Sequence, residues 1–471
     1  MASPSVAVVG GGLCGCAAAE ALLEAGVEVS LLDMGRGGVG GRASSRAVWL
    51  SEGGAEAASA DSAEQTLAFE HGCQFFATRP KATSSFGDAL ARAGAERWPA
   101  RASGRLGWLV RGAFVPPGDE RAEGLGEGLF GACSSDLELH AAPGICAKLV
   151  AALEEKHKAK LRVHRGARVT GIVCANSGSW ELKADGLHHE CTAEELRGRS
   201  GGGLQRSFDA VVLTDHMVFL PDWHPLHVTG LHGAAPRLVA AVRKALDWDE
   251  ESRRFRSIAS LFTCMLAFAP GSGPSVPFDA ACVAGSAVLQ WVCRQASKFP
   301  EAAEGAAECW VLVSTEAFAE SCLRGEPLSE RRESAEVWYK PQTDDYLKGD
   351  PAAEMLRAFQ AAVGPLLPSG QLSAPLYSRC QRWGAAYPLA REAAETAPYY
   401  AASDYDSSVA ASGLFAAGDW ARPEPPRHAE AAFESGRAVA AAAVAAAKAA
   451  AALRESSEPE KSPKRARTRA E

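Results

Sequence analysis

Three glycines near the start of the chain have the spacing of a dinucleotide-binding turn. Gly10, Gly12 and Gly15 form the pattern G-x-G-x-x-G, and Asp33 follows at the distance typical of such sites. The first glycine permits a tight turn, the second lets the backbone approach a pyrophosphate, and the third lets a helix pack closely on the sheet. An acidic residue accepts from ribose hydroxyls and would repel the 2′-phosphate of NADP. The spacing therefore predicts a site for FAD or NAD.

The residues around these glycines predict the elements that such a turn requires. Val6–Val9 is a short apolar β-type run, and a helix rich in Ala and Leu extends from the turn to about Ala25. Gly26 ends this helix, and a second β-rich run, Val27–Leu32, leads to the aspartate. Strand, turn, helix and strand form one βαβ unit, whose helix directs its free N–H groups and positive dipole end at the phosphates. Because the whole unit has the required order, we expect a nucleotide site here.

A second glycine-rich segment lies a few residues after Asp33. The pair Gly40-Gly41 directly precedes Arg42. A glycine pair lets a loop return over the pyrophosphate, and a guanidinium can pair with phosphate oxygens. We therefore expect Gly41 and Arg42 to complete the cofactor site, and this segment favours FAD over NAD.

Later motifs extend the comparison along the chain. They are His71–Arg79, Leu289–Val292, Ser297-Lys298, Gln381–Trp383 and Leu414–Trp420. Together with the N-terminal glycines and Arg42, these segments resemble renalase and the renalase-like FAD/NAD(P)-binding oxidoreductases of the flavin amine-oxidase superfamily. The resemblance extends from Val6 to about Val444 and is interrupted by two polar insertions, near 51–66 and 192–207.

The resemblance implies an α/β fold, α+β overall, with two domains. A Rossmann-type FAD domain with p-hydroxybenzoate-hydroxylase-like topology is expected from residues 1–80, 136–219 and 405–455. A substrate domain built on an antiparallel sheet is expected from 81–135 and 220–404, and a basic tail, 456–471, is expected to be disordered. Two domains also agree with a length of 471 residues, which exceeds what one core usually holds.

Further elements follow from local patterns. Leu161–His164, Arg168–Cys174 and Trp180–Ala184 are predicted to be strands of a small antiparallel meander. Ala429 to about Arg454 is predicted to be a long Ala-rich helix.

The resemblance also assigns residues to the cofactor. Gly418 and Asp419 match the residues that contact the ribityl and phosphate part of the flavin. Val169 matches a residue whose backbone pairs with adenine. The stretch Ala429–Phe433 matches the helix start that points at the isoalloxazine, where a helix dipole stabilises a reduced, anionic flavin.

Four side chains are candidates for the substrate side. Trp383 is expected to lie over the flavin and Lys298 near flavin N5, as the two candidate catalytic residues. The alternatives are a half-buried core tryptophan and a solvated lysine. Arg79 and Arg382 are expected to pair with anionic groups of the substrate.

Three functions remain open on this basis. The first is a renalase-like oxidase, in which a reduced substrate such as a dihydronicotinamide dinucleotide isomer passes hydride to flavin N5 and O2 is reduced to H2O2. The second is a flavin amine oxidase, or a desaturase or isomerase of the same superfamily. The third is a non-catalytic FAD-binding scaffold.

Composition limits the remaining possibilities. A net charge of −8 and a pI near 5.9 argue against a general nucleic-acid-binding surface. The thirteen cysteines show no metal-ligand spacing, so no metal is expected, and their odd number indicates reduced thiols in the cytoplasm. The basic tail leaves a nuclear location open.

No apolar run of membrane-spanning length is expected, since Lys448 interrupts the closest one, Ala438–Leu453. The sequence does not determine the oligomeric state.

Overall fold

The structure is a computed structural model of the 471-residue chain. It describes residues 3–35, 38–51, 54–57, 59–80, 84–99, 105–175, 178–186, 203–299, 306–331, 337–391, 396–406 and 413–457. Most of the expected insertion near 192–207 and nearly all of the basic tail lie outside these ranges, so the disorder expected of the tail stays a prediction.

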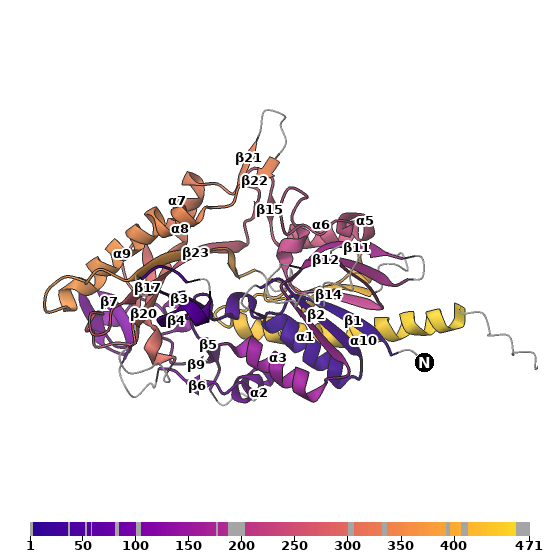
Figure 1. Cartoon of the computed structure of the whole chain (residues 1–471), viewed down its shortest axis with the longest axis horizontal. Helices are drawn as coiled ribbons and strands as arrows, with labels where there is room; N and C mark the ends of the chain where they lie inside the picture. Colours follow the sequence, from indigo (N-terminus) through magenta and orange to yellow (C-terminus); the bar gives the residue numbers. More distant parts are fainter. Residues whose placement is uncertain are drawn as a thin grey trace, which may run out of the picture.

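A six-stranded sheet carries the dinucleotide-binding turn (Figure 1). In spatial order its strands are β10 (Leu161–Arg165), β2 (Glu28–Asp33), β1 (Ser5–Val9), β14 (Ala210–Leu213), β25 (Leu414–Ala417) and β24 (Tyr399–Ala401). All neighbours are parallel except β24, which runs antiparallel to β25. The sheet is thus assembled from three separate stretches of chain, as the resemblance implied.

Both faces of this sheet are covered, and β14, β25 and the last four residues of β1 are therefore apolar at every position. Along β1, Val6 and Val8 face a core shared with α1 (Leu13–Glu24), α3 (Ile145–Lys156) and α10 (His428–Ser457). Ala7 and Val9 face a second core on the opposite side. There the cover consists of the sheet β11–β12–β13 with α5 (Leu231–Ala234) and α6 (Pro236–Ala245) (Figure 1).

The small antiparallel sheet differs from its prediction. Its strands are β11 (Ala167–Cys174), β12 (Trp180–Gly186) and β13 (Gly203–Phe208). Leu161–His164, predicted as its first strand, belongs to β10 at the edge of the parallel sheet, where Leu161 pairs with Val29. The prediction was wrong because α3 acts as a crossover that returns the chain parallel to β2. The third strand, β13, comes from a segment predicted to be a polar insertion.

A seven-stranded sheet forms the second layer of the molecule. Its order is β23 (Tyr377–Pro388), β17 (Ile258–Phe268), β20 (Glu308–Ser314), β19 (Leu289–Arg294), β18 (Ala280–Val283), β7 (Leu106–Val110) and β8 (Ala113–Val115). All neighbours are antiparallel except β18 and β7. Helices α7 (Glu316–Gly325), α8 (Asp344–Lys348) and α9 (Asp350–Val363) cover one face, and the hairpin β3 (Arg46–Leu50)–β4 (Gln65–Phe69) packs on the other.

Shorter elements join the two sheets. A three-stranded sheet contains β5 (Phe76–Thr78), β9 (Glu138–Ala141) and β6 (Glu96–Arg97), and α2 (Ser85–Arg92) packs near it. Two small hairpins are β15 (Trp248–Asp249)–β16 (Arg254–Phe255) and β21 (Ser329–Arg331)–β22 (Val337–Tyr339). The second hairpin projects from the body at the top of the view in Figure 1.

The proposed division into two domains stays a prediction, but the packing departs from it in two places. Leu231, Leu238 and Val242, expected in the substrate domain, pack in the core on the six-stranded sheet. Strand β24, also expected there, pairs with β25 in the same sheet. These apolar residues close a face and an edge that the six-stranded sheet would otherwise expose to solvent.

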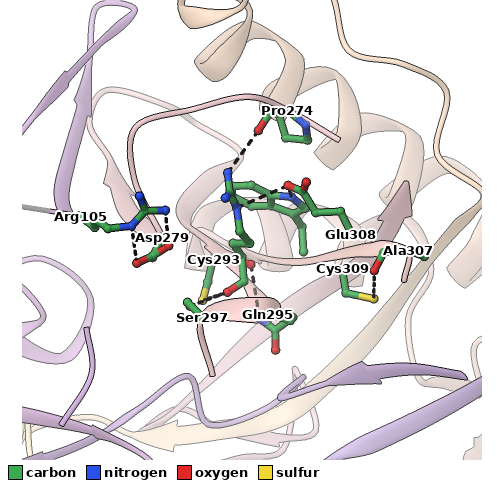
Figure 2. A network of polar contacts seen from close by, with 11 residues as sticks. Arg105, Pro274, Asp279, Cys293, Gln295, Ser297, Ala307, Glu308 and Cys309 are labelled. Atoms are coloured by element: carbon green, nitrogen blue, oxygen red, sulfur yellow. Dashed lines mark hydrogen bonds and ion pairs between the residues drawn. The ribbon is translucent and has the colours of Figure 1, made fainter. Parts of the chain in front are cut away.

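Charged side chains near the ends of β7, β18, β19 and β20 of the seven-stranded sheet are paired with one another. The Arg105 guanidinium donates two hydrogen bonds to Asp279, both 2.7 Å long (Figure 2). Glu308 accepts from the Trp310 indole at 2.7 Å and lies 3.4 Å from the guanidinium of Arg294. In this network each guanidinium faces a carboxylate, which compensates for its partial burial.

Helix α10 is the one element in the described ranges that is long and apolar enough to be a candidate membrane span. The most apolar 18-residue window between His428 and Arg454 has a mean hydropathy of 1.4, and 33% of that window is buried. The apolar run Ala438–Leu453 of this helix was not expected to span a membrane, because Lys448 interrupts it. This helix packs in the core against α1 through Val439, Ala440 and Ala443. It therefore covers one face of the six-stranded sheet.

Candidate functional site

A cavity of about 1700 Å³ begins at the carboxyl ends of β1 and β2 and extends past the edge strand β23. Pockets for one small ligand measure about 300–1000 Å³, so this cavity has room for a dinucleotide and a second molecule. We call its two extremities the glycine end and the arginine arm. The glycine end consists of Gly10, Gly11, Gly12, Gly40 and Gly41; the arginine arm consists of His224, Tyr339 and Arg382.

The three glycines of the first turn have different tasks. Gly10 has a φ of +107°, and a Cβ there would overlap the hydroxyl of Thr214. A Cβ on Gly15 would overlap the carbonyl oxygen of Gly10, so this glycine lets α1 pack against the turn. A Cβ on Gly12 would come no closer than 3.8 Å to Gly40 O. Gly12 therefore keeps space free within the cavity, whereas the other two shape the protein itself.

The amino terminus of α1 is open to a ligand. Its N-cap is Gly12, which offers no side-chain acceptor, and its first turn holds no acidic residue. Gly12, Leu13 and Cys14 all line the cavity. Free N–H groups and the positive dipole end of a helix bind phosphate well, so these residues fit the pyrophosphate of a dinucleotide.

Asp33 holds the two loops of the glycine end together. One carboxylate oxygen accepts from Gly11 N at 2.6 Å, and the other accepts from Gly35 N at 2.7 Å. Burial raises the pKa of Asp33, and these two backbone N–H groups oppose the rise. The carboxylate lines the cavity and keeps lone pairs for a further donor, so the ribose contact stays a prediction that the geometry allows.

Arg42 and Asp419 meet at the floor of the cavity, although 377 residues separate them. The guanidinium donates to both carboxylate oxygens at 2.8 and 2.6 Å, and also to Ala386 O at 3.1 Å. Burial opposes ionisation of Asp419, but the guanidinium outweighs it and holds the pKa of that carboxyl below its ordinary value. The sequence predicted two separate cofactor contacts; the structure makes them one ion pair that ties the first segment of the chain to the last.

The start of α10 supplies another wall. His428, Ala429 and Ala432 line the cavity, in the stretch that the resemblance placed at the flavin. Gly418 precedes this helix, and its N–H donates to Ser435 Oγ at 2.8 Å, inside the protein. The backbone N–H of Gly418 is thus used for fixing α10, and Asp419 is the member of the pair that faces the cavity with its side chain.

Trp383 is fixed on the cavity side of β23. Its indole N–H lies 3.1 Å from Thr263 Oγ1 and 3.2 Å from His71 O, and its ring centroid lies 5.2 Å from that of His71. A Cβ on Gly72 would overlap the carbonyl oxygen of Arg42 and would lie 3.0 Å from the indole, so the glycine is needed where Arg42 and Trp383 approach it. Trp383 lines the cavity, and its predicted position over a flavin stays a prediction.

Sequence reasoning missed an aromatic cluster that lines the same cavity as Trp383. Phe130 and Tyr387 contact each other at 4.9 Å and 88°, and the ring of His428 lies 5.4 Å from each of them. Burial lowers the pKa of His428 to about 4, and that of His71 likewise to about 4, so both rings are neutral at pH 7. The only local signal was the tyrosine shortly after Trp383; the other two residues come from distant segments.

Three residues with predicted roles do not line the cavity. Lys298 is 4% exposed and lies 4.9 Å from the Trp98 ring, because η7 (Gln295–Ser297) turns it behind β19. Arg79 follows β5 and is exposed to solvent. The Val169 side chain packs in the core between β11 and the six-stranded sheet. These three residues are thus absent from the cavity lining, and the roles predicted for Lys298, Arg79 and the backbone of Val169 stay predictions.

In the described ranges, no group of three or more His, Cys, Asp or Glu side chains is placed to hold a metal ion, and the cysteines form no disulfides.

Comparison with known proteins agrees with this geometry. Residues 8–89 match the family model of the NAD(P)-binding Rossmann-like domain. No curated protein matches the sequence. A putrescine oxidase variant with redesigned cofactor binding superposes with a TM-score of 0.52 at 14% identity, covering 94% of this chain and 100% of the other. An oxidoreductase from Methanosarcina mazei gives 0.51 at 14% identity, covering 92% and 99%.

Identities this low show similarity of fold alone. They confirm the predicted fold class, in which a Rossmann-type sheet is combined with a second, mostly antiparallel sheet. The chain thus shares its fold, over nearly its whole length, with putrescine oxidase and the Methanosarcina oxidoreductase.

Proposed function

We propose that this protein is an FAD-dependent oxidoreductase. The observation that carries the proposal is the open amino terminus of α1, with Gly12 facing a cavity that has room for a dinucleotide and a substrate. The fold shared with putrescine oxidase, whose cofactor binding was redesigned in the compared variant, supports it.

The residues of the glycine end fit the dinucleotide part of FAD. The N–H groups at the start of α1 would bind the pyrophosphate, and Asp33 would accept from the ribose. Arg42 and Asp419, at the cavity floor, would hold the polar chain between the phosphates and the flavin ring. Val39 and Met34 line the cavity beside Asp33 and would contact the adenosine half.

The chemistry that FAD supplies when bound is transfer of a hydride from a reduced donor and then of two electrons to O2, which with one proton from the reduced flavin and one from solvent gives H2O2. The protein contributes position and environment. Trp383 is fixed by hydrogen bonds and offers a flat surface to an aromatic ring. Phe130 and Tyr387 add aromatic surface to the cavity, and His71 and His428, which also line it, are neutral at pH 7.

A dihydronicotinamide dinucleotide isomer, as in the renalase-like proteins, is the donor we favour. Its flat ring suits the wall formed by Trp383, and its phosphates suit a cavity with a cationic extremity. An amine oxidase is the alternative, because the fold is that of putrescine oxidase. The ring geometry weighs against it: Phe130 and Tyr387 contact each other at 4.9 Å, which leaves no slot between them for an amine.

Cofactor identity is tested first. The purified protein should be yellow, and acid precipitation should release all of the flavin as FAD, because no residue here is expected to link it covalently. A colourless protein that added FAD cannot reconstitute would contradict the proposal. Flavin that stays in the pellet would show a covalent link and would contradict the non-covalent site.

The donor is tested by anaerobic bleaching of the yellow protein. Dihydronicotinamide dinucleotides reduced at an unusual ring position should bleach the flavin faster than ordinary NADH. Trp383→Ala should slow this reaction by about tenfold or more, because the ring loses its stacking surface, while the FAD content stays unchanged. Bleaching by putrescine but by no dihydronicotinamide would replace our donor with an amine. Bleaching by no donor would favour a non-catalytic FAD scaffold.

A further inference from the structure

Arg382 occupies an unusual position at the arginine arm of the cavity. It lies on β23, which is the edge strand of the seven-stranded sheet, and it lines the cavity. Its Nη1 atom is buried and has no hydrogen-bond partner among the described residues. Its Nη2 atom lies 3.5 Å from the hydroxyl oxygen of Tyr339, a long contact. In the described part of the chain, no carboxylate forms an ion pair with this guanidinium.

Four other arginines that line the cavity, Arg42, Arg254, Arg379 and Arg427, form ion pairs with carboxylates. Arg254 donates two bonds of 2.7 Å to Glu320, and Arg379 forms an ion pair with Asp344. Arg105, which directly precedes β7 of the seven-stranded sheet, is likewise paired with a carboxylate, that of Asp279 (Figure 2).

The lack of a partner at Arg382 has a cost. Removing a charged group from water without a counter-charge is unfavourable, and burial accordingly lowers the pKa of Arg382. Such a group is expected where a ligand supplies the missing charge.

Two neighbours of Arg382 offer further donors. Nδ1 of His224 accepts from Leu226 N at 3.2 Å, so in the neutral ring the proton is on Nε2, which can donate. Burial and the nearby Arg382 lower the pKa of His224 to about 4, which keeps the ring neutral at pH 7. The Tyr339 ring lies 5.1 Å from that of His224, and its hydroxyl accepts from Arg382 and so keeps its own proton for a ligand.

We propose that Arg382, Tyr339 and His224 form a subsite that binds a phosphate group of the electron donor. Trp383 follows Arg382 on β23, and both residues line the cavity, which extends past this edge strand. A donor whose nicotinamide ring lies on the indole of Trp383 can therefore place a phosphate group at the arginine arm. The identity of the bound molecule as electron donor rests on the proposed function; the binding of an oxyanion does not. The subsite selects donors that carry phosphate, and hairpin β21–β22 takes part by contributing Tyr339.

The first experiment measures anion binding without turnover. Inorganic pyrophosphate is titrated into the oxidised FAD-loaded protein by calorimetry, for the wild type, Arg382→Met and the matched control Arg254→Met, whose arginine lines the same cavity in an ion pair. We expect Arg382→Met to weaken binding about tenfold or more, the usual size of a lost charged hydrogen bond, and Arg254→Met to change it less than threefold. Tyr339→Phe should give a smaller loss.

Each other result of this titration counts against the subsite. No pyrophosphate binding by the wild type, or equal binding by Arg382→Met, overturns it. Tighter binding of a dicarboxylate such as succinate than of pyrophosphate would assign the subsite to a carboxylate and make the phosphate assignment wrong. Thermal unfolding of each variant shows whether Arg382→Met is folded, and Arg382→Lys keeps a charge in place if it is not.

The second experiment links the subsite to the donor. Anaerobic flavin reduction is compared for a dihydronicotinamide dinucleotide and a phosphate-free N-benzyl dihydronicotinamide. The preference of the wild type for the dinucleotide, as the ratio of apparent Kd values, should fall about tenfold in Arg382→Met. An unchanged ratio overturns the proposal. If neither compound reduces the wild type while pyrophosphate still binds through Arg382, the proposed function fails and the anion site stands.

Discussion

The two extremities of the cavity offer a ligand different kinds of contact. The glycine end presents backbone: Gly12 leaves space where a Cβ would stand, and the first N–H groups of α1 have no side-chain cap. The arginine arm presents side chains, with Arg382 half-buried and its Nη1 unpartnered within the described ranges.

We therefore expect the glycine end to have a fixed geometry and the arginine arm to determine which ligand is preferred. The geometry of a helix amino terminus is set by the main chain and suits any pyrophosphate. A cluster of three side chains from different segments depends on packing, so substitution can change its preference without disturbing the fold. We therefore expect substitutions at the glycine end to affect cofactor content and those at the arginine arm to affect substrate choice.

The largest effect is expected from Gly12→Val. Its side chain would enter open cavity, since the nearest protein atom to a Cβ there is 3.8 Å away. The protein should fold with an unchanged Tm in the flavin-free form and contain no FAD, as measured by absorbance after purification. Gly15→Val is the contrasting variant, because a Cβ there overlaps Gly10 O and the fold itself should be destabilised. FAD content equal to that of the wild type in Gly12→Val would remove the glycine end as the cofactor site.

The next effect concerns the ion pair at the cavity floor. Arg42→Met leaves the Asp419 carboxylate, which is 2% exposed, without its counter-charge. Breaking a buried pair from one side costs about 3–5 kcal/mol, and we expect the lower part of that range because the Arg42 side chain is 36% exposed. Urea unfolding of the flavin-free protein measures it. A loss below about 1 kcal/mol would show that the pair behaves like a surface salt bridge.

A smaller effect is expected for Asp33→Ala. The substitution removes the acceptor for the Gly11 and Gly35 N–H groups and the proposed acceptor for the ribose. FAD affinity should fall by about 1–3 kcal/mol, the usual cost of leaving polar groups unpaired. Fluorescence titration of flavin-free protein with FAD gives the value. Asp33→Asn is the control that keeps one acceptor oxygen, and it should lose less than Asp33→Ala.

The smallest effect is a pH dependence of stability. His71, His224 and His428 have pKa values lowered to about 4 by burial, whereas unfolded histidine titrates near 6.5. Between these values the unfolded chain binds protons that the folded chain excludes, so stability is lost as the pH falls from about 6.5 towards 4.

Two buried carboxyls act in the opposite direction. The raised pKa values of Asp33 and Glu70 make the folded state take up protons more readily on acidification. The contribution of one histidine is therefore best isolated by comparing variants. The Tm of His428→Gln should decline less than that of the wild type between pH 6.5 and 4.5. Parallel curves would show that His428 titrates normally.

Much of the six-stranded sheet and its glycine end could be predicted from local sequence. The βαβ unit follows from spacing within one short segment, and Asp33 and Gly12 lie where that spacing puts them. The order of β10 was missed, because whether a strand pairs in parallel depends on the crossover helix before it and not on its own residues.

The sequence by itself determined that a dinucleotide-binding turn exists, because its glycines and helix start interact across a few residues. Only the tertiary structure decided which arginines are neutralised: Arg42 meets a carboxylate 377 residues away, whereas Arg382 meets none in the described ranges. It also placed Lys298 and Arg79 outside the lining of the cavity, since the burial of one and the exposure of the other are consequences of packing. Charge pairing and burial depend on neighbours that are distant in sequence, and the order of residues along the chain does not record them.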